Sequence, residues 1–332
     1  DAMTSLVVQT SFLGDMVLTT PLIAELAARG PVDVVATPAS AALLANHPAV
    51  RRVIVYDKRR TARGIAGFRR VTGAMRESGA ESVYLAQGSL RSAALAFAAG
   101  IPSRVGFSTS AGRALYTRRV PYRHDLHHAA RLWQLAVPDR EPDAGQIRPR
   151  LYPGAAERSA VEALLGGAAD ARPLLALAPG SVWATKRWPY YAELARALAP
   201  LARILVVGSA EDRALASEIV GAAGLGAVDA TGALSLLGSA ELIGRCRVLV
   251  TNDSAPQHLA SAMGTRTVTI FGPTVPEFGF GPLAPHSIVV GHTGLTCRPC
   301  DKHGPPTCPL KHWKCMRELM PDDVAERVRH LL

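Results

Sequence analysis

The sequence predicts an α/β protein made of two domains, each built around a doubly wound parallel sheet. Strand-like and helix-like apolar patterns alternate from the first residues, stop at a Pro-rich stretch, and then start again. The length of 332 residues agrees with this, because one hydrophobic core seldom serves more than about 250–300 residues. We therefore predict domains at 1–150 and 151–332, with a ligand-binding cleft between them.

The first half contains short runs rich in Val, Leu and Ile, separated by longer stretches of helical periodicity. These patterns predict strands at 6–9, 32–36, 53–56 and 82–85 and helices at 16–28 and 39–46. Four prolines interrupt the charged stretch 138–154. Because Pro and Gly break regular elements, we predict that this stretch is the linker.

The second half repeats the alternation. It predicts strands at 174–178, 204–207, 248–251 and 267–271, and helices at 190–198, 214–222 and 236–245. Ligands of doubly wound sheets bind beyond the carboxyl ends of the strands. The loops that follow the predicted strands are therefore the segments in which to look for functional residues.

The chain is basic, with a formal net charge of +10 and a pI near 9.8. Such a charge favours phosphorylated ligands or an anionic membrane surface. Aromatic residues make up 5% of the chain and are not interleaved with Lys or Arg, which argues against nucleic acid as the partner. The basic clusters at 51–52, 58–60 and 69–70 either contact anionic lipid headgroups or simply solvate the surface.

Two features of the sequence bear on location. No apolar run approaches the roughly 20 residues that span a bilayer, and no leader pattern precedes the first strand-like run. We expect a cytoplasmic protein, either free or held peripherally at a membrane.

The loop after the first predicted strand reads Ser11-Phe12-Leu13-Gly14-Asp15. Gly14 allows a tight turn, and Asp15 then lies near a helix start at the sheet edge that faces the cleft. Asp15 is a candidate general base, and the alternative is a helix cap. The loop matches neither the dinucleotide fingerprint nor the Walker A motif, which argues against a dehydrogenase and a P-loop enzyme.

A second small-residue loop, Pro179-Gly180-Ser181, follows the first predicted strand of the second half. Ser181 and the loop amides could meet phosphate oxygens, and Lys186 could place a positive charge against a diphosphate. The alternative is a surface loop with an incidental lysine.

A third loop runs from Thr251 to His258, with Pro256 at an expected helix start. Ser254 and the first amides of that helix would form an anion cradle, and His258 would face the ligand unless it is a structural histidine. A further loop, 271–274, ends the next strand. Together these loops predict a nucleotide diphosphate site in the second domain and an acceptor site near Asp15.

The ordered set Ser-Phe-Leu-Gly-Asp, Pro-Gly-Ser, Thr-Lys-Arg-Trp-Pro, Thr-Asn-Asp-Ser-Ala-Pro-Gln-His and Phe-Gly-Pro-Thr resembles glycosyltransferase family 9. It is similar to the ADP-heptose:lipopolysaccharide heptosyltransferases, more to the second type than to the first. The resemblance implies a GT-B fold with two facing Rossmann-like domains. It implies inverting transfer of L-glycero-D-manno-heptose from ADP-heptose, with no required cofactor and no catalytic metal. The implied acceptor is the heptosyl/Kdo–lipid A inner core, met at the cytoplasmic face of the inner membrane.

The resemblance also implies roles for single residues. Asp15 would be the base, and Lys186 would act on the leaving diphosphate. The other implied donor-binding residues are Ser181, Glu211 at the ribose, Leu234 at the adenine, Asp253, Ser254, Ala255 and His258. Implied acceptor contacts are Ser11, Gly14, Arg104 and His128. First-type enzymes often carry Thr-Gly where this chain has Ser254-Ala255, which argues against the first type.

Two alternatives to this function remain open. The chain could be a family 9 transferase that uses another nucleotide sugar or a protein acceptor. It could also be a non-catalytic protein that binds a nucleotide sugar or nucleic acid.

Four of the five cysteines fall within nineteen residues, at Cys297, Cys300, Cys308 and Cys315. Thiolates at such spacing can close a tetrahedral site, so a structural Zn or Fe is one interpretation. The other is reduced thiols packing a Pro-rich loop in a cytosolic protein. The cluster also resembles a feature of second-type heptosyltransferases. Cys246 lies in a helix-like stretch and is predicted to be core.

Overall fold

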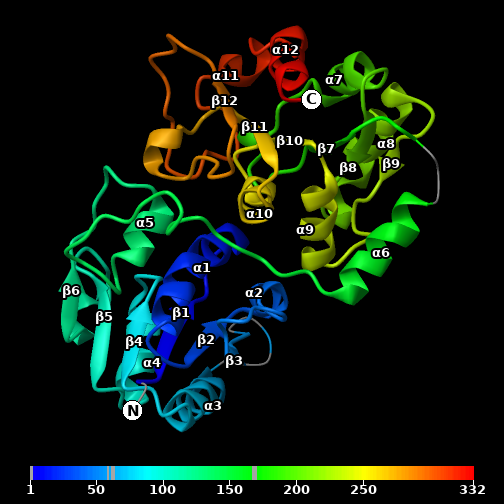
Figure 1. Ribbon diagram of the computed structural model, residues 1–332. Coiled ribbons are helices and arrows are strands. Elements are labelled where there is room, and N and C mark those ends of the chain that lie inside the picture. The colour runs from blue at the N-terminus through cyan, green and yellow to red at the C-terminus, as the bar shows by residue number, and fades with distance from the viewer. Residues whose placement is uncertain (1–2, 58–59, 61–63, 167–169) are drawn as a thin grey trace. The chain divides into compact units, whose positions relative to one another are not determined.

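The computed structural model describes residues 3–57, 60, 64–166 and 170–332, so Lys58 and Arg59 of one basic cluster lie outside the described residues. The chain forms two compact units, Asp1–Tyr152 and Pro153–Leu332. Each unit is a parallel sheet with helices packed against it (Figure 1).

Unit 1 contains a six-stranded sheet in the order β3-β2-β1-β4-β5-β6, with parallel pairing throughout. The central strand β1 is buried along its whole length, as expected for a strand covered on both faces. The strands of unit 1 are β1 (Ser5–Gln9), β2 (Val32–Ala36), β3 (Arg52–Val55), β4 (Ser82–Leu85), β5 (Ser103–Phe107) and β6 (Arg118–Val120).

The helices of unit 1 pack in two groups. Helix α1 contacts α2 and α5, whereas α3 contacts α4. The bounds are α1 (Leu13–Ala27), α2 (Pro38–Leu43), α3 (Gly64–Glu77), α4 (Leu90–Ala98) and α5 (His128–Trp133).

Unit 2 contains a six-stranded parallel sheet in the order β12-β11-β10-β7-β8-β9. Read from β9 to β12, this order is the same as that of unit 1, since in both sheets the first strand of the unit lies beside the fourth. The strands are β7 (Leu174–Ala178), β8 (Arg203–Val206), β9 (Val228–Asp229), β10 (Val248–Asn252), β11 (Arg266–Phe271) and β12 (Ile288–Gly291).

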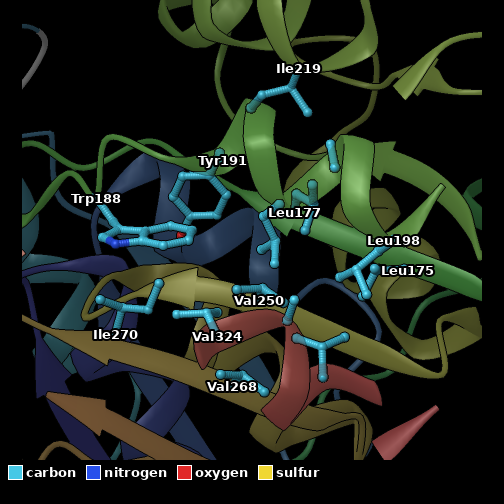
Figure 2. Close-up of a cluster of buried hydrophobic side chains, with 14 of the residues drawn as sticks. Leu175, Leu177, Trp188, Tyr191, Leu198, Ile219, Val250, Val268, Ile270 and Val324 are labelled. Atoms are coloured by element: carbon cyan, nitrogen blue, oxygen red, sulfur yellow. The ribbon is translucent and has the colours of Figure 1, made fainter. Parts of the chain in front are cut away.

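The core of unit 2 joins three central strands to helices on one face of the sheet. Leu177, Val250 and Ile270 come from β7, β10 and β11 and pack in one cluster with Trp188 and Tyr191 (Figure 2). The helices of this unit are α6 (Ala155–Leu165), α7 (Tyr191–Leu198), α8 (Arg213–Ala223), α9 (Leu236–Arg245), α10 (Ala255–Met263), α11 (Lys314–Arg317) and α12 (Pro321–Leu331).

The predicted α/β class is confirmed, and the predicted strands and helices are present with small shifts at their ends. Residues 138–154 form no helix or strand, and those up to Tyr152 belong to unit 1. Helix α1 begins at Leu13 rather than at Met16, so Asp15 belongs to its first turn. Among the described helices, none is both long and apolar enough to cross a bilayer.

One predicted basic cluster has an internal partner. Asp33 in β2 is fully buried, and Arg51 binds it with two hydrogen bonds of 2.8 Å. Arg52 lies 3.3 Å from the same carboxylate. Because a buried carboxylate needs a compensating charge, these two arginines stabilise the fold by neutralising Asp33.

Candidate active site

In each sheet the strand order reverses between two central neighbours, β1 and β4 in unit 1 and β7 and β10 in unit 2. The loops that leave such neighbours diverge and open a crevice at the carboxyl edge, where doubly wound sheets bind ligands. The three predicted motif loops follow β1, β7 and β10. The structure therefore places all three at these reversal points.

Asp15 lies in the first turn of α1 with its carboxylate turned to side chains rather than to helix amides. The N-cap residue is Phe12, and no side chain caps the helix. The Ser11 hydroxyl donates to Asp15 Oδ2 at 2.5 Å, and His128 Nε2 lies 3.8 Å from Asp15 Oδ1. The helix-cap interpretation of Asp15 is therefore wrong, because its carboxylate bonds to Ser11.

Two glutamines that the sequence interpretation overlooked organise this loop. Gln9 is buried, and its Oε1 accepts from the Ser11 amide at 3.2 Å. Thr10 donates its hydroxyl proton to Gln87 Oε1, in the loop that follows the neighbouring strand β4. The signal for Gln9 was its place as a polar residue that ends an apolar strand.

The predicted acceptor residues separate into two groups. Ser11, Gly14 and His128 lie with Asp15, with Gly14 buried in the first turn of α1. Arg104 pairs in register with Val83 near the amino end of its strand, at the opposite edge of the sheet. Its guanidinium donates to the Leu115 and Ile101 carbonyls, both at 2.7 Å. The structure therefore does not bring Arg104 to Asp15, because Arg104 lies near the amino end of β5 and Asp15 follows the carboxyl end of β1.

In unit 2, Lys186 and Asp253 form an ion pair between two motif loops. Lys186 Nζ lies 2.7 Å from Asp253 Oδ2, and each side chain is only 11% exposed. Gln257 Nε2 donates to Asp253 Oδ1 at 2.9 Å, and the Thr274 hydroxyl donates to Oδ2 at 2.7 Å. Three hydrogen-bonded partners hold this carboxylate, which fixes the ammonium of Lys186 in turn.

Asn252 supplies a second link between the same loops. It is fully buried, and its Nδ2 donates to the Pro179 carbonyl at 2.9 Å. Its Oδ1 accepts from the Trp188 amide and from the Tyr191 hydroxyl, each at 3.2 Å. Because these bonds are buried, they fix the Pro-Gly-Ser loop against the end of β10. The sequence did not reveal this role, although Asn252 belongs to the motif loop from Thr251 to His258.

The remaining predicted donor residues lie along the same carboxyl edge. Ser254 is the N-cap residue of α10 without a capping hydrogen bond, and His258 is buried one turn into that helix. Glu211 is exposed after β8, and Leu234 is half-buried after β9. Ser181 accepts a hydrogen bond from the Trp183 amide at 3.3 Å.

Gly180 shows how closely two of these loops approach each other. A Cβ atom at Gly180 would lie 2.4 Å from Asp212 Oδ1. A larger residue at position 180 would therefore force the Asp212 side chain to move. Asp212, which the sequence interpretation did not select, also accepts from the Ser209 amide at 2.8 Å and thereby orders the loop after β8.

Comparisons with known proteins identify the family of this chain. The profile of glycosyltransferase family 9 (heptosyltransferase) matches residues 68–314. The chain belongs to this family. Lipopolysaccharide heptosyltransferase 2 of Salmonella typhimurium is 30% identical over 304 residues, covering 82% of this chain and 84% of that protein. Lipopolysaccharide heptosyltransferase 1 of Pseudomonas aeruginosa is 30% identical over 325 residues, covering 90% and 86%.

Solved structures of glycosyltransferase family 9 match the whole chain. Heptosyltransferase II of E. coli superposes with a TM-score of 0.80 at 27% identity, covering 99% of this chain and 98% of that one. The family 9 glycosyltransferase from Veillonella parvula gives 0.88 at 22% identity, covering 100% and 97%. The predicted GT-B class and the predicted enzyme class, a glycosyltransferase, are confirmed.

The four clustered cysteines of this family 9 enzyme lie near one another on the carboxyl-terminal segment 297–315. Burial raises the pKa of the Cys315 thiol to about 11, and the nearby thiols of Cys300, Cys308 and Cys297 add to the shift. Cys297 Sγ lies 3.9 Å from His312 Nε2.

Among the residues that the structure describes, no group of three or more His, Cys, Asp or Glu is placed to hold a metal ion. The structural metal predicted at the cysteines therefore gains no support from this geometry. Cys246, predicted as core, is buried directly after α9, and burial raises its pKa to about 12.

Proposed function

We propose that this family 9 enzyme transfers L-glycero-D-manno-heptose from ADP-heptose to the heptosyl/Kdo–lipid A inner core of lipopolysaccharide. The observation that carries the proposal is the Lys186–Asp253 pair at the strand-order reversal of unit 2. It holds the Lys186 ammonium in a fixed position at the edge where a nucleotide diphosphate would bind. The names of the relatives point the same way, and E. coli heptosyltransferase WaaC has been solved with ADP-2-deoxy-2-fluoro heptose.

On the donor side, Lys186 and Ser181 would contact the diphosphate. As the bond between the anomeric carbon and the phosphate oxygen breaks, negative charge grows on the departing ADP. A lysine already held by Asp253 stabilises that charge without reorganising. The other proposed donor contacts are Glu211 with the ribose, Leu234 with the adenine, and Asp253, Ser254, Ala255 and His258 with the sugar and phosphates.

On the acceptor side, Asp15 would take the proton of the attacking hydroxyl. The oxygen then attacks the anomeric carbon on the face opposite ADP, which inverts the configuration. The Ser11 hydroxyl donates to this carboxylate and would orient the base, and His128 Nε2 lies 3.8 Å from its other oxygen. In this mechanism Lys186 provides the charge stabilisation for which other transferases use a metal ion, so we propose that no cofactor is required.

A donor screen tests the proposal. Purified protein is incubated with ADP-, UDP- and GDP-sugars, including ADP-heptose, and a Kdo-containing acceptor. We expect product only with ADP-heptose. Turnover with a different donor would favour another family 9 specificity, and no turnover with any donor would favour a binding protein.

We also propose that the enzyme works in the cytoplasm and meets its lipid-linked acceptor at the membrane surface. Arg69 and Arg70 are exposed on α3 and carry part of the positive charge. Co-sedimentation with phosphatidylglycerol vesicles should be strong at low salt and weak at high salt. Binding to neutral vesicles of equal strength would contradict an electrostatic contact.

A further inference from the structure

The Cys-rich segment 297–315 contacts the Lys186–Asp253 pair, and the mechanism above assigns it no role. Cys300 donates its amide to the Pro273 carbonyl at 2.8 Å. The Thr185 hydroxyl donates to the Pro305 carbonyl. The segment is therefore hydrogen-bonded to the loop after β11 and to the turn that carries Lys186.

Arg298 makes the most extensive of these contacts. Its guanidinium donates to the carbonyls of Gly272 at 2.5 Å, Phe271 at 2.9 Å and Thr274 at 3.1 Å. It also donates to the His292 carbonyl. The rigid fork of a guanidinium can hold several carbonyls at fixed spacing, which a lysine cannot do. Arg298 thus fixes the backbone of the loop 271–274.

The loop that Arg298 holds supplies a hydrogen bond to the proposed donor site. The Thr274 hydroxyl donates to Asp253 Oδ2 at 2.7 Å, and the same oxygen binds Lys186 Nζ at 2.7 Å. Thr274 is 1% exposed, so its hydroxyl has little freedom to find another partner. A chain of contacts therefore runs from Arg298 through Thr274 and Asp253 to Lys186.

Gly304 provides a second and independent contact with Lys186. It is buried with φ +83°, and a Cβ there would lie 3.3 Å from Lys186 Cε and 3.2 Å from Pro273 Cγ. The backbone of the segment thus packs directly on the lysine side chain, where a larger residue would displace it.

We propose that Arg298 is a positioning residue for nucleotide-sugar binding, and that the Cys-rich segment braces the donor site by holding Thr274 and the stem of Lys186. The proposal rests on the proposed function, because it takes the Lys186–Asp253 pair to be the diphosphate site. It gives this segment a role that does not depend on a bound metal.

The test compares Arg298→Ala, Arg298→Lys and Thr274→Val with the parent. We expect Arg298→Ala to weaken ADP binding by about tenfold or more in calorimetry and to raise the KM for ADP-heptose. Arg298→Lys should recover only part of the affinity. Arg247→Ala is the matched control, because Arg247 is exposed just before the amino end of β10, and it should bind ADP like the parent.

Two further readouts separate positioning from a loss of stability. In hydrogen exchange without ligand, peptides covering 271–275 and 299–301 should exchange faster in Arg298→Ala, while the core strands stay protected. In a double-mutant cycle, adding Thr274→Val to Arg298→Ala should weaken ADP binding no further than about twofold, because both act on one contact chain.

The outcomes are distinct. If the parent binds ADP and Arg298→Ala binds it equally well, or the two substitutions are fully additive, the positioning role is refuted. If the parent binds no ADP, the proposed function fails and this inference fails with it. If Arg298→Ala does not fold, Arg298→Lys and Thr274→Val decide in the same assays, and unchanged ADP binding in both refutes the proposal.

Discussion

Replacing Asp15 by Asn should abolish most of the transfer activity and leave the fold intact. Asn has the same shape, and its Oδ1 can still accept from Ser11, as Asp15 does at 2.5 Å. It cannot take a proton, so loss of a general base predicts a fall in kcat of about 10²–10⁴-fold, or about 2.7–5.5 kcal/mol in the barrier. Because Asp15 caps no helix amide, the free energy of unfolding should fall by only about 0.3–1 kcal/mol, the value of a carboxylate near a helix start.

The assay is initial-rate transfer at saturating ADP-heptose and acceptor, with ADP affinity and thermal unfolding measured on the same samples. Glu25→Gln is the matched control on the same helix. Glu25 accepts from Trp133 Nε1 at 3.2 Å and pairs with Arg29 at 2.6 Å near the other end of α1, so its kcat should match the parent. A variant Asp15→Asn that keeps more than about a tenth of the parent kcat would refute Asp15 as the base.

Three other predictions follow from the structure. Burial lowers the pKa of His47 to about 4, so the unfolded chain binds the extra proton and stability should drop by about 1–3 kcal/mol between pH 6.5 and 4. In His47→Asn this drop should disappear from denaturant titrations, and an unchanged pH slope would contradict the assignment. Leu177→Ala should lower the free energy of unfolding, measured in urea, by about 2–5 kcal/mol because Leu177 is fully buried. Leu225→Ala is the control and should change that free energy little because Leu225 is fully exposed, and equal effects of the two substitutions would contradict the core assignment. A chelator should leave kcat unchanged, and a chelator-dependent loss of kcat would contradict metal-free transfer. The metal content per chain, measured on the same untagged sample, decides between bound metal and free thiols at the cysteines.

Sequence patterns found most of the strands and several helices, and they missed helix α3 (Gly64–Glu77), although its apolar residues repeat at helical spacing. Helix α3 contains Gly64, Gly67 and Gly73, which lower helix propensity. It forms because Gly67, Val71 and Met75 share one buried face against the rest of unit 1. That stabilisation comes from tertiary contacts and leaves little trace in local propensity.

The same distinction applies to the candidate site. Lys186, Asp253 and Asp15 were predicted because each stands in a small-residue loop after a strand-like run. Thr274 and Arg298 were not, because their polar groups act on partners from other segments. Gln257 was also not predicted, although its partner Asp253 lies only four residues earlier. Arg104 is the opposite case, since a basic residue outside any predicted strand carries no sign of the end of the sheet at which it will lie.

The sequence alone determined that two doubly wound halves exist and that their motif loops lie at strand ends. It could do so because hydrophobic periodicity is local, and because parallel strands bring all their carboxyl ends to one edge. Only the tertiary structure decided that Lys186 meets Asp253, 67 residues away in the chain, and that Thr274 and Arg298 hold the pair. Those contacts depend on the register between distant strands and on the directions of buried side chains, neither of which is encoded in any short stretch of sequence.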